Sequence, residues 1–314
     1  MISAEHKDNI IPKAEFYDET DSDNVCIFCE NPNYKTLYVV KHYGFKIRFQ
    51  KCRCGLIKQT PMPNETFFSW FFNSKIFLSA KQENSEKIWG YYDFFKDESC
   101  RLATSQLRFK KLCHLFKIRK PINIIKIGPA TGTFLYIANQ HKLNAIGCDV
   151  SSQFIEFAKK NYNVRIDHGR FEKLDYVDGQ FDVVLLFNVI ENIPNVSEFL
   201  STVKRRVKIG GYFILNFVDM TNNLIEKFQK DRYFLYRPPV CYIYQKEVLS
   251  KLLLRYDLKP VNLMLDIRYI HMEKILTLLQ WKYIYKIIRP LKIHRIPFPI
   301  YAYPSKIIVA RRVK

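Results

Sequence analysis

Two glycines and a distant aspartate have the types and spacing of a nucleoside-binding site. Gly128 and Gly132 lie in IKIGPATGTFL (125–135), which reads as a buried strand, a tight turn and the start of a helix. Glycine lets the backbone turn sharply and approach a ligand closely. Asp149 follows Gly132 by seventeen residues, at the end of the next predicted strand, where a carboxylate can accept both hydroxyls of a ribose. These residues predict a site for a nucleoside-containing cofactor.

Four cysteines near the N-terminus have the spacing of a metal site. Cys26 and Cys29 form a Cys-x2-Cys pair, and Cys52 and Cys54 form a Cys-x-Cys pair after 22 intervening residues. Two such pairs can place four thiolates around one tetrahedral zinc ion, as in a zinc ribbon. The metal would organise a module too small to fold on its core alone. The alternative is four ordinary thiols. The intervening segment 34–49 alternates β-branched and aromatic residues, which predicts a β-hairpin.

The elements that must position these groups alternate regularly from residue 122 onward. Continuous apolar runs at 122–127 and 181–187 are typical of buried parallel strands. Further strands are expected at 145–148, 164–166, 212–217, 260–267 and 306–310, and helices at 131–141, after Ser151 or Ser152, at 196–207 and at 245–254. This alternation predicts an α/β fold with a parallel sheet, helices on both faces and ligands at the carboxyl ends of the strands.

The chain of 314 residues has a net charge of +20, which raises the question of an anionic partner. The last 89 residues hold 19 Lys/Arg against 6 Asp/Glu. Three explanations of this basic charge are open. It could be a solvated face in a chain of biased composition, it could bind an anionic substrate or membrane surface, or it could bind RNA. No apolar run reaches the roughly 18–20 residues that span a bilayer, and the polar N-terminus has no signal-peptide core. We therefore expect a cytoplasmic protein without a transmembrane segment.

Two later segments narrow the cofactor. FDVVLLFNVIENI (181–193) and KIGGYFILN (208–216) follow the glycine turn and Asp149 in order. With these four features the chain resembles the class I S-adenosylmethionine (SAM)-dependent methyltransferases over roughly residues 90–314. The spacing GxAxG differs from the dehydrogenase GxGxxG, and a Gly-Gly turn before the fifth strand is typical of the methyltransferases. The resemblance implies a Rossmann-like, mostly parallel seven-stranded sheet whose last strand is antiparallel.

The resemblance also implies roles for individual residues. The expected cofactor-binding residues are Gly128, Ala130 and Gly132 under the methionine part of SAM, Asp149 at the ribose, Val150, Arg170 and Phe171 around the adenine, and Phe187 beside the sulfonium. Glu191 is the first candidate for a catalytic base, and Asn188 would orient the acceptor. His168 is a more remote candidate base.

Two positions depart from the family pattern. Lys126 stands where members usually carry Glu or Asp, so the local charge near the cationic cofactor is reversed. Glu191-Asn192 replaces the Glu-His pair that follows the fourth strand, so a frequent candidate base is missing. A degenerate, non-catalytic protein with the methyltransferase fold is therefore an alternative.

The order of segments resembles one bacterial group of sugar and small-molecule methyltransferases. In that group a zinc ribbon precedes a segment like GYYDF (90–94), in which Tyr91 or Tyr92 could line the cofactor mouth, and then the methyltransferase domain. The expected organisation is a tail at 1–24, a zinc-ribbon-like module at 25–62, a helical linker or lid at 63–118 and the SAM-dependent domain at 119–314. The implied acceptor is a small molecule, nucleotide sugar or glycan precursor. RNA methylation is the alternative, and contact with an anionic membrane surface is a further expectation.

Overall fold

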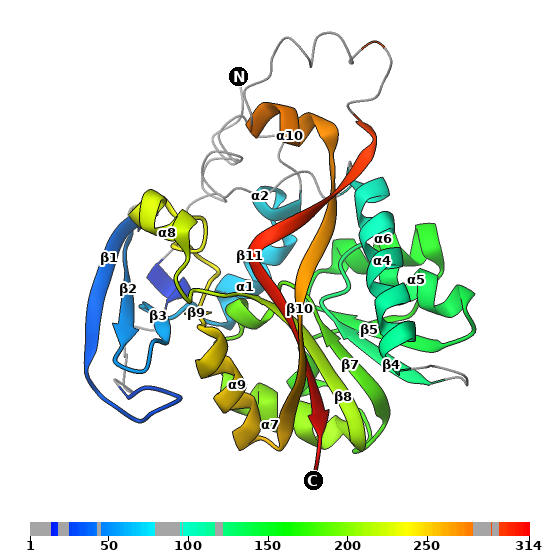
Figure 1. The fold of residues 1–314 in the computed structure, drawn as a ribbon, viewed down its shortest axis with the longest axis horizontal. Coiled ribbons are helices and arrows are strands. Elements are labelled where there is room, and N and C mark those ends of the chain that lie inside the picture. Colours follow the sequence, from blue (N-terminus) through cyan, green and yellow to red (C-terminus); the bar gives the residue numbers. More distant parts are fainter. Residues whose placement is uncertain are drawn as a thin grey trace.

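Two β-sheets lie side by side in the computed structural model (Figure 1). The structure describes residues 14–17, 25–42, 45–78, 95, 97–116, 122–278, 290 and 295–314. The predicted Tyr91 and Tyr92 lie outside these residues. Among the residues described, no helix combines the length and the apolar character that a membrane span requires.

The larger sheet has seven strands in the order β10-β11-β8-β7-β4-β5-β6. Their bounds are β4 Asn123–Ile127, β5 Asn144–Asp149, β6 Ile166–His168, β7 Phe181–Leu186, β8 Val207–Val218, β10 Leu258–His271 and β11 Pro297–Arg312. The pairs among β4, β5, β6, β7 and β8 are parallel, whereas β11 is antiparallel to both β8 and β10. The predicted Rossmann-like sheet with an antiparallel last strand is confirmed.

Helices cover both faces of this sheet, as expected from its doubly apolar strands. Their bounds are α4 Glu98–Phe116, α5 Thr133–Gln140, α6 Ser152–Tyr162, α7 Val196–Arg206 and α9 Lys246–Arg255. Ile124 of β4 belongs to the same core cluster as α4 and α5, and Ile125 and Ile127 belong to the cluster of α7 and α9. Because side chains alternate along a strand, Lys126 is on the same face as Ile124 and is directed toward α4.

The smaller sheet joins three N-terminal strands to a strand from the C-terminal half of the chain. It has the order β1-β2-β3-β9 with antiparallel pairs, and its strands are β1 Tyr34–His42, β2 Phe45–Cys52, β3 Ile57–Thr60 and β9 Tyr242–Ile243. The predicted hairpin is β1 and β2. The fourth strand comes from the C-terminal half of the chain, with Ile57 opposite Ile243. The N-terminal sheet is thus completed by the larger domain.

Aromatic side chains connect the segment before the main sheet to the rest of the protein. This segment contains the short helix η2 (Ala14–Phe16), α1 (Glu65–Asn73) and α2 (Lys75–Leu78). Phe16 is buried and stacks on Trp70 with ring centroids 5.3 Å apart, and the buried Tyr17 forms a β-bridge with Pro63. The described part of the predicted tail therefore packs on α1.

The last two strands are longer than predicted. Residues 267–271 of β10 pair with 297–301 of β11 beyond the bulge after Leu265, and the two strands form a ribbon that projects from the sheet and leads to α10 (Met272–Leu278) (Figure 1).

The predicted Gly-Gly turn is wrong in one respect. Gly210 and Gly211 lie within β8, where Gly210 has φ +81° and accommodates an irregularity in the pairing with β7. The remaining elements are α8 (Leu224–Gln229) and the short helices η3 (Phe171–Lys173), η4 (Ile190–Asn192) and η5 (Lys230–Arg232).

Candidate active site

A cavity of about 900 Å³ lies at the carboxyl ends of β4, β5 and β7. Parallel sheets bind ligands at this edge, and the volume is near the upper end of the range for small-molecule sites. The lining includes all ten residues predicted for the cofactor and the acceptor except Gly132, that is Gly128, Ala130, Asp149, Val150, Arg170, Phe171, Phe187, Asn188 and Glu191. The structure therefore brings the predicted residues together around one cavity.

The turn after β4 requires glycine at two positions. Gly128 has φ +62° and Gly132 has φ +81°, a backbone region that L side chains rarely adopt. A Cβ atom on Gly128 would lie 2.8 Å from Cγ2 of Val189, and one on Gly132 would lie 2.8 Å from Cβ of Ala158. Gly128 thus allows the loop after β7 to approach the turn closely, whereas Gly132 allows α5 and α6 to pack closely.

Asp149 is held at the tip of β5 by backbone donors. One carboxylate oxygen accepts the N–H of Ala130 at 3.2 Å, and the other accepts the N–H of Ser151 at 3.0 Å. Burial raises the pKa of this carboxyl, and the hydrogen bonds from Ser151 and Ala130 oppose that shift. The arrangement orients a carboxylate beside the glycine turn, where a ribose would lie.

Arg170 and Phe171, which were predicted to flank the adenine, line the cavity but also contact other parts of the protein. Arg170 bridges Glu65 of α1 at 2.8 Å and Glu172 at 3.0 Å. Phe171 is almost completely buried, and its ring centroid lies 6.1 Å from that of Phe199. Phe171 is therefore mainly a core residue with one edge in the cavity wall.

The loop after β7 presents the predicted acceptor residues. Asn188 has φ +60°, and its N–H donates to Oδ1 of Asn216 at 2.6 Å. Glu191 is buried, and its Oε1 accepts the N–H of Val218 at 2.9 Å. Burial raises the pKa of Glu191, although the N–H of Val218 opposes that shift. His168 lines the same cavity, with Nε2 3.3 Å from the carbonyl oxygen of Val150.

Lys126 is only partly charged at neutral pH in this environment. Its Nζ donates to the carbonyl oxygen of Gly128 at 3.0 Å and lies 5.9 Å from the ring centroid of Phe187. Burial and, next, the nearby Arg108 guanidinium lower its pKa to about 7, although Asp149 opposes that shift. The unusual lysine therefore does not place a full positive charge beside the cavity above pH 7.

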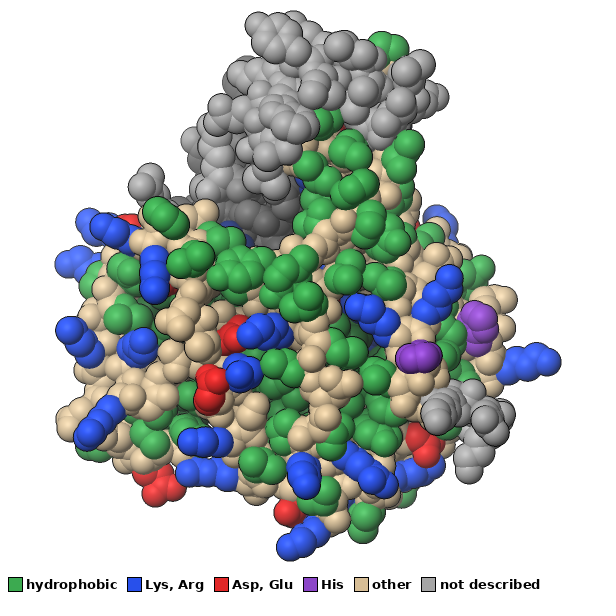
Figure 2. All heavy atoms as spheres, in the orientation of Figure 1, with side chains coloured by type: hydrophobic (Ala, Val, Ile, Leu, Met, Phe, Trp, Pro, Cys, Tyr) green, Lys and Arg blue, Asp and Glu red, His purple; other side chains and the backbone are tan. Residues whose placement is uncertain are grey.

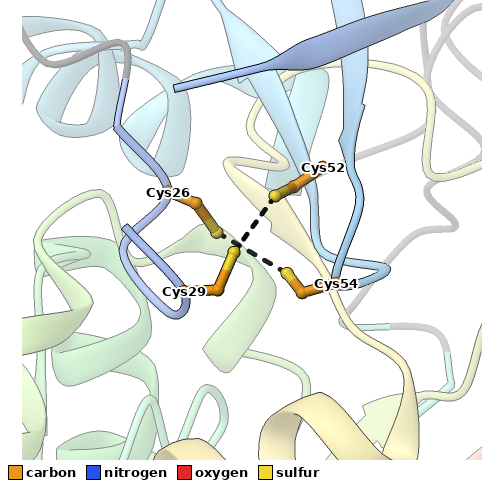
Figure 3. A group of neighbouring side chains, drawn as sticks. All are labelled: Cys26, Cys29, Cys52 and Cys54. Carbon is orange, nitrogen blue, oxygen red and sulfur yellow. Dashed lines mark hydrogen bonds between the residues drawn. The ribbon is translucent and has the colours of Figure 1, made fainter. Parts of the chain in front are cut away.

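The four N-terminal cysteines converge on one point (Figure 3). Their sulfur atoms lie within 4.8 Å of one another, with 3.6 Å between Cys26 and Cys54 and 3.4 Å between Cys29 and Cys52. Sulfurs at the corners of a tetrahedral zinc site with Zn–S bonds of about 2.3 Å are about 3.8 Å apart. The donor set and its spacing are compatible with one zinc ion.

Residues 125–215 match the family described as "Methyltransferase domain". A magnesium protoporphyrin IX methyltransferase from Synechocystis PCC 6803, solved with bound SAH, superimposes with a TM-score of 0.51 at 14% identity, over 79% of this chain and all of that one. A SAM-dependent methyltransferase from Archaeoglobus fulgidus aligns with a TM-score of 0.48 at 17% identity, over 72% and 97%. An uncharacterized protein of Methanocaldococcus jannaschii is 29% identical over 147 residues, 46% of this chain and 67% of that protein.

The chain has the class I methyltransferase fold. The matched segment runs from β4 through most of β8 and so contains the glycine turn, Asp149 and the loop with Asn188 and Glu191.

One polar cluster beside the cavity was not anticipated from the sequence. Asp266 of β10 is completely buried and contacts Arg108 of α4, Arg268, Asn216 of β8 and Ser305 of β11. These residues are up to 197 positions apart in the chain. A lone Asp-x-Arg in an edge strand carries no signal, so only the strand order assembles this group.

Proposed function

We propose that this protein binds SAM in the cavity at the carboxyl ends of β4, β5 and β7 and transfers its methyl group to a small polar acceptor. One observation carries the proposal. The left-handed turn at Gly128 and the fixed carboxylate of Asp149 line the same cavity as Asn188 and Glu191. In this proposal, the cofactor and the acceptor bind at two parts of one cavity.

Methyl transfer from a sulfonium is an in-line displacement, so the protein mainly has to align two reactants. In this proposal Asp149 binds the ribose hydroxyls, and Phe187 and Asn188 lie beside the sulfonium and the acceptor. Glu191 accepts a proton when the acceptor is a hydroxyl. Its raised pKa makes it a stronger base than an ordinary glutamate.

A sugar or another small precursor of a glycan or natural product is the acceptor class that we favour over RNA. The cavity has the volume of a small-molecule site. On the face in Figure 2, lysine and arginine side chains are scattered among apolar ones and do not form a continuous basic surface. A nucleic-acid enzyme usually presents such a surface.

We further propose that Cys26, Cys29, Cys52 and Cys54 bind a structural zinc ion. The metal would fix the loop before β1 to the end of β2. That region is connected to the candidate site, because the N–H of Gln59 donates to the carbonyl of Cys241 at 2.9 Å and the N–H of Cys241 donates to the carbonyl of Glu191 at 2.7 Å. The zinc module would thereby support the loop that carries the candidate base in a cytoplasmic enzyme.

Calorimetric titration of the full-length protein with SAM and with S-adenosylhomocysteine tests the proposal. We expect both ligands to bind with one site per chain. If neither ligand binds at millimolar concentration, the protein is not a SAM-dependent enzyme, and the degenerate alternative is correct.

A further inference from the structure

One wall of the cavity is formed by residues that have no role in the proposed binding of the cofactor. It consists of Arg108 from α4, Arg268 from β10 and Ser305 from β11. Nη2 of Arg268 lies 2.9 Å from Oδ1 of Asn188 and 3.1 Å from Oγ of Ser305. Since Asn188 follows β7, where the methyl group would be transferred, this guanidinium lies on the acceptor side of the cavity.

Asp266 fixes the two guanidinium groups of this wall. Its Oδ1 accepts from Nη2 of Arg108 at 2.8 Å, and its Oδ2 accepts from Nε of Arg268 at 2.7 Å. Asn216 and Ser305 also donate to Oδ2, each at 3.0 Å. A carboxylate with this many donors does not swing away, so it holds Arg268 in one orientation.

The charge of this cluster is not balanced by the protein groups in it. One buried carboxylate faces two arginines, which leaves an excess of one positive charge. The Arg268 side chain is 30% exposed, whereas Asp266 is inaccessible. The excess charge is therefore presented to the cavity. Nε of Arg108 is also buried without a hydrogen-bond partner among the residues that the structure describes.

The lining of the whole cavity also has an excess of positively charged residues. Even with Lys126 left out, because its pKa is lowered to about 7, the described lining holds six basic residues, Arg101, Arg108, Arg170, Arg237, Arg268 and Lys274, against five acidic ones, Glu65, Asp97, Asp149, Glu172 and Glu191. A cavity built only for a cationic sulfonium would be expected to be acidic. Binding SAM would add positive charge, so the cavity would favour a second ligand that carries negative charge.

We propose that Arg268, held by Asp266 and flanked by Ser305, binds an oxyanion group, phosphate or carboxylate, of the methyl acceptor. This inference rests on the proposed function, because it names the acceptor class of the same cavity. A guanidinium fixed on one edge still presents donors on another, and its planar fork matches both oxyanions.

The test is calorimetry of the full-length protein with inorganic phosphate and with acetate at constant ionic strength, each with and without saturating S-adenosylhomocysteine. We expect one of these anions to bind, and Arg268→Gln to weaken that binding at least tenfold. The matched control is Arg205→Gln, an exposed arginine of α7 paired with Asp178, which should leave anion binding unchanged. If Arg268→Gln does not fold, Arg268→Lys takes its place in the experiment. This variant keeps a charge beside Asp266 and should bind the anion with intermediate affinity.

The two anions distinguish the acceptor chemistry. Tighter binding of phosphate assigns a phosphorylated acceptor, and tighter binding of acetate assigns a carboxylate. If neither anion binds, or if Arg268→Gln and Arg205→Gln affect binding equally, Arg268 only attaches the ribbon to the sheet and the inference is overturned. Failure of the proposed function has a different signature, since S-adenosylhomocysteine would not bind the wild type while Arg268-dependent anion binding could persist.

Discussion

The side chain of Lys126 reaches the turn that follows β4, where its Nζ lies 3.0 Å from the carbonyl oxygen of Gly128. The structure therefore explains how a lysine can occupy the position where the related methyltransferases usually carry Glu or Asp. Lys126 is on the α4 face of β4, where burial and Arg108 lower its pKa to about 7. A neutral amine that donates to the turn can coexist with a cationic cofactor.

This relationship predicts that SAM binds more tightly as the pH rises through 7. Lys126 loses its positive charge over that range, so its repulsion of the sulfonium disappears. We expect a gain in affinity of roughly threefold or more between pH 6 and pH 8.5, measured by calorimetry. S-adenosylhomocysteine lacks the sulfonium charge and should show a smaller dependence. The same pH dependence for both ligands, or its persistence in Lys126→Met, would contradict this role.

The lowered pKa also predicts a pH dependence of stability. The unfolded chain holds the Lys126 proton up to its ordinary pKa of 10.5, whereas the folded protein releases it near pH 7. Between these values the unfolded state binds more protons, so this group makes the free energy of unfolding rise with pH. Urea unfolding of the wild type and of Lys126→Met from pH 7 to pH 9 should show a steeper rise for the wild type. Parallel curves would mean that Lys126 is charged in the fold.

Glu191→Gln should separate catalysis from binding. Glutamine keeps the oxygen that accepts the N–H of Val218, so the loop should remain folded, but it cannot accept a proton. With a hydroxyl acceptor we expect the methyl-transfer rate to fall roughly 100- to 10,000-fold, while the affinity for S-adenosylhomocysteine changes less than about threefold. A nearly unchanged rate would show that Glu191 only anchors the start of the loop to β8.

The cysteine cluster predicts a stoichiometric metal. Protein purified without added zinc should contain close to one equivalent by elemental analysis, and Cys52→Ser should lose it. Because a bound zinc ion would stabilise the fold, the variant's Tm should fall by roughly 5 °C or more. Cys113→Ser replaces a half-buried thiol of α4 outside the cluster and is the matched control. A metal content well below one per chain in the wild type would leave four ordinary thiols.

Much of the fold could be predicted because its signals are local. The runs at Asn123–Ile127 and Phe181–Leu186 are buried on both faces, which only a central parallel strand requires. The glycine turn and Asp149 are likewise specified by neighbours in the chain. Apart from Gly132, which packs against α6, the site residues taken from the resemblance line one cavity, but their roles stay predictions.

The remaining features depend on contacts that a single segment does not encode. Strand β9 has two residues, and only its pairing with β3 defines it. The length of the β10–β11 ribbon depends on mutual pairing across residues 267–271 and 297–301. Asp266 would be read as an exposed charge in an edge strand, yet it is completely buried and accepts hydrogen bonds from Arg108, Asn216, Arg268 and Ser305. Non-local pairing therefore sets the limit of the sequence-based predictions.

The central claim is that Asp149 binds the ribose of SAM, and a matched pair of variants tests it most directly. Asp149→Asn removes the charge and keeps an acceptor oxygen for only one of the N–H groups of Ala130 and Ser151, whereas Asp178→Asn makes the same change at an exposed residue paired with Arg206. In calorimetric titration with S-adenosylhomocysteine, we predict that Asp149→Asn loses roughly tenfold to a hundredfold in affinity and that Asp178→Asn matches the wild type. Equal affinities in all three proteins would contradict the account.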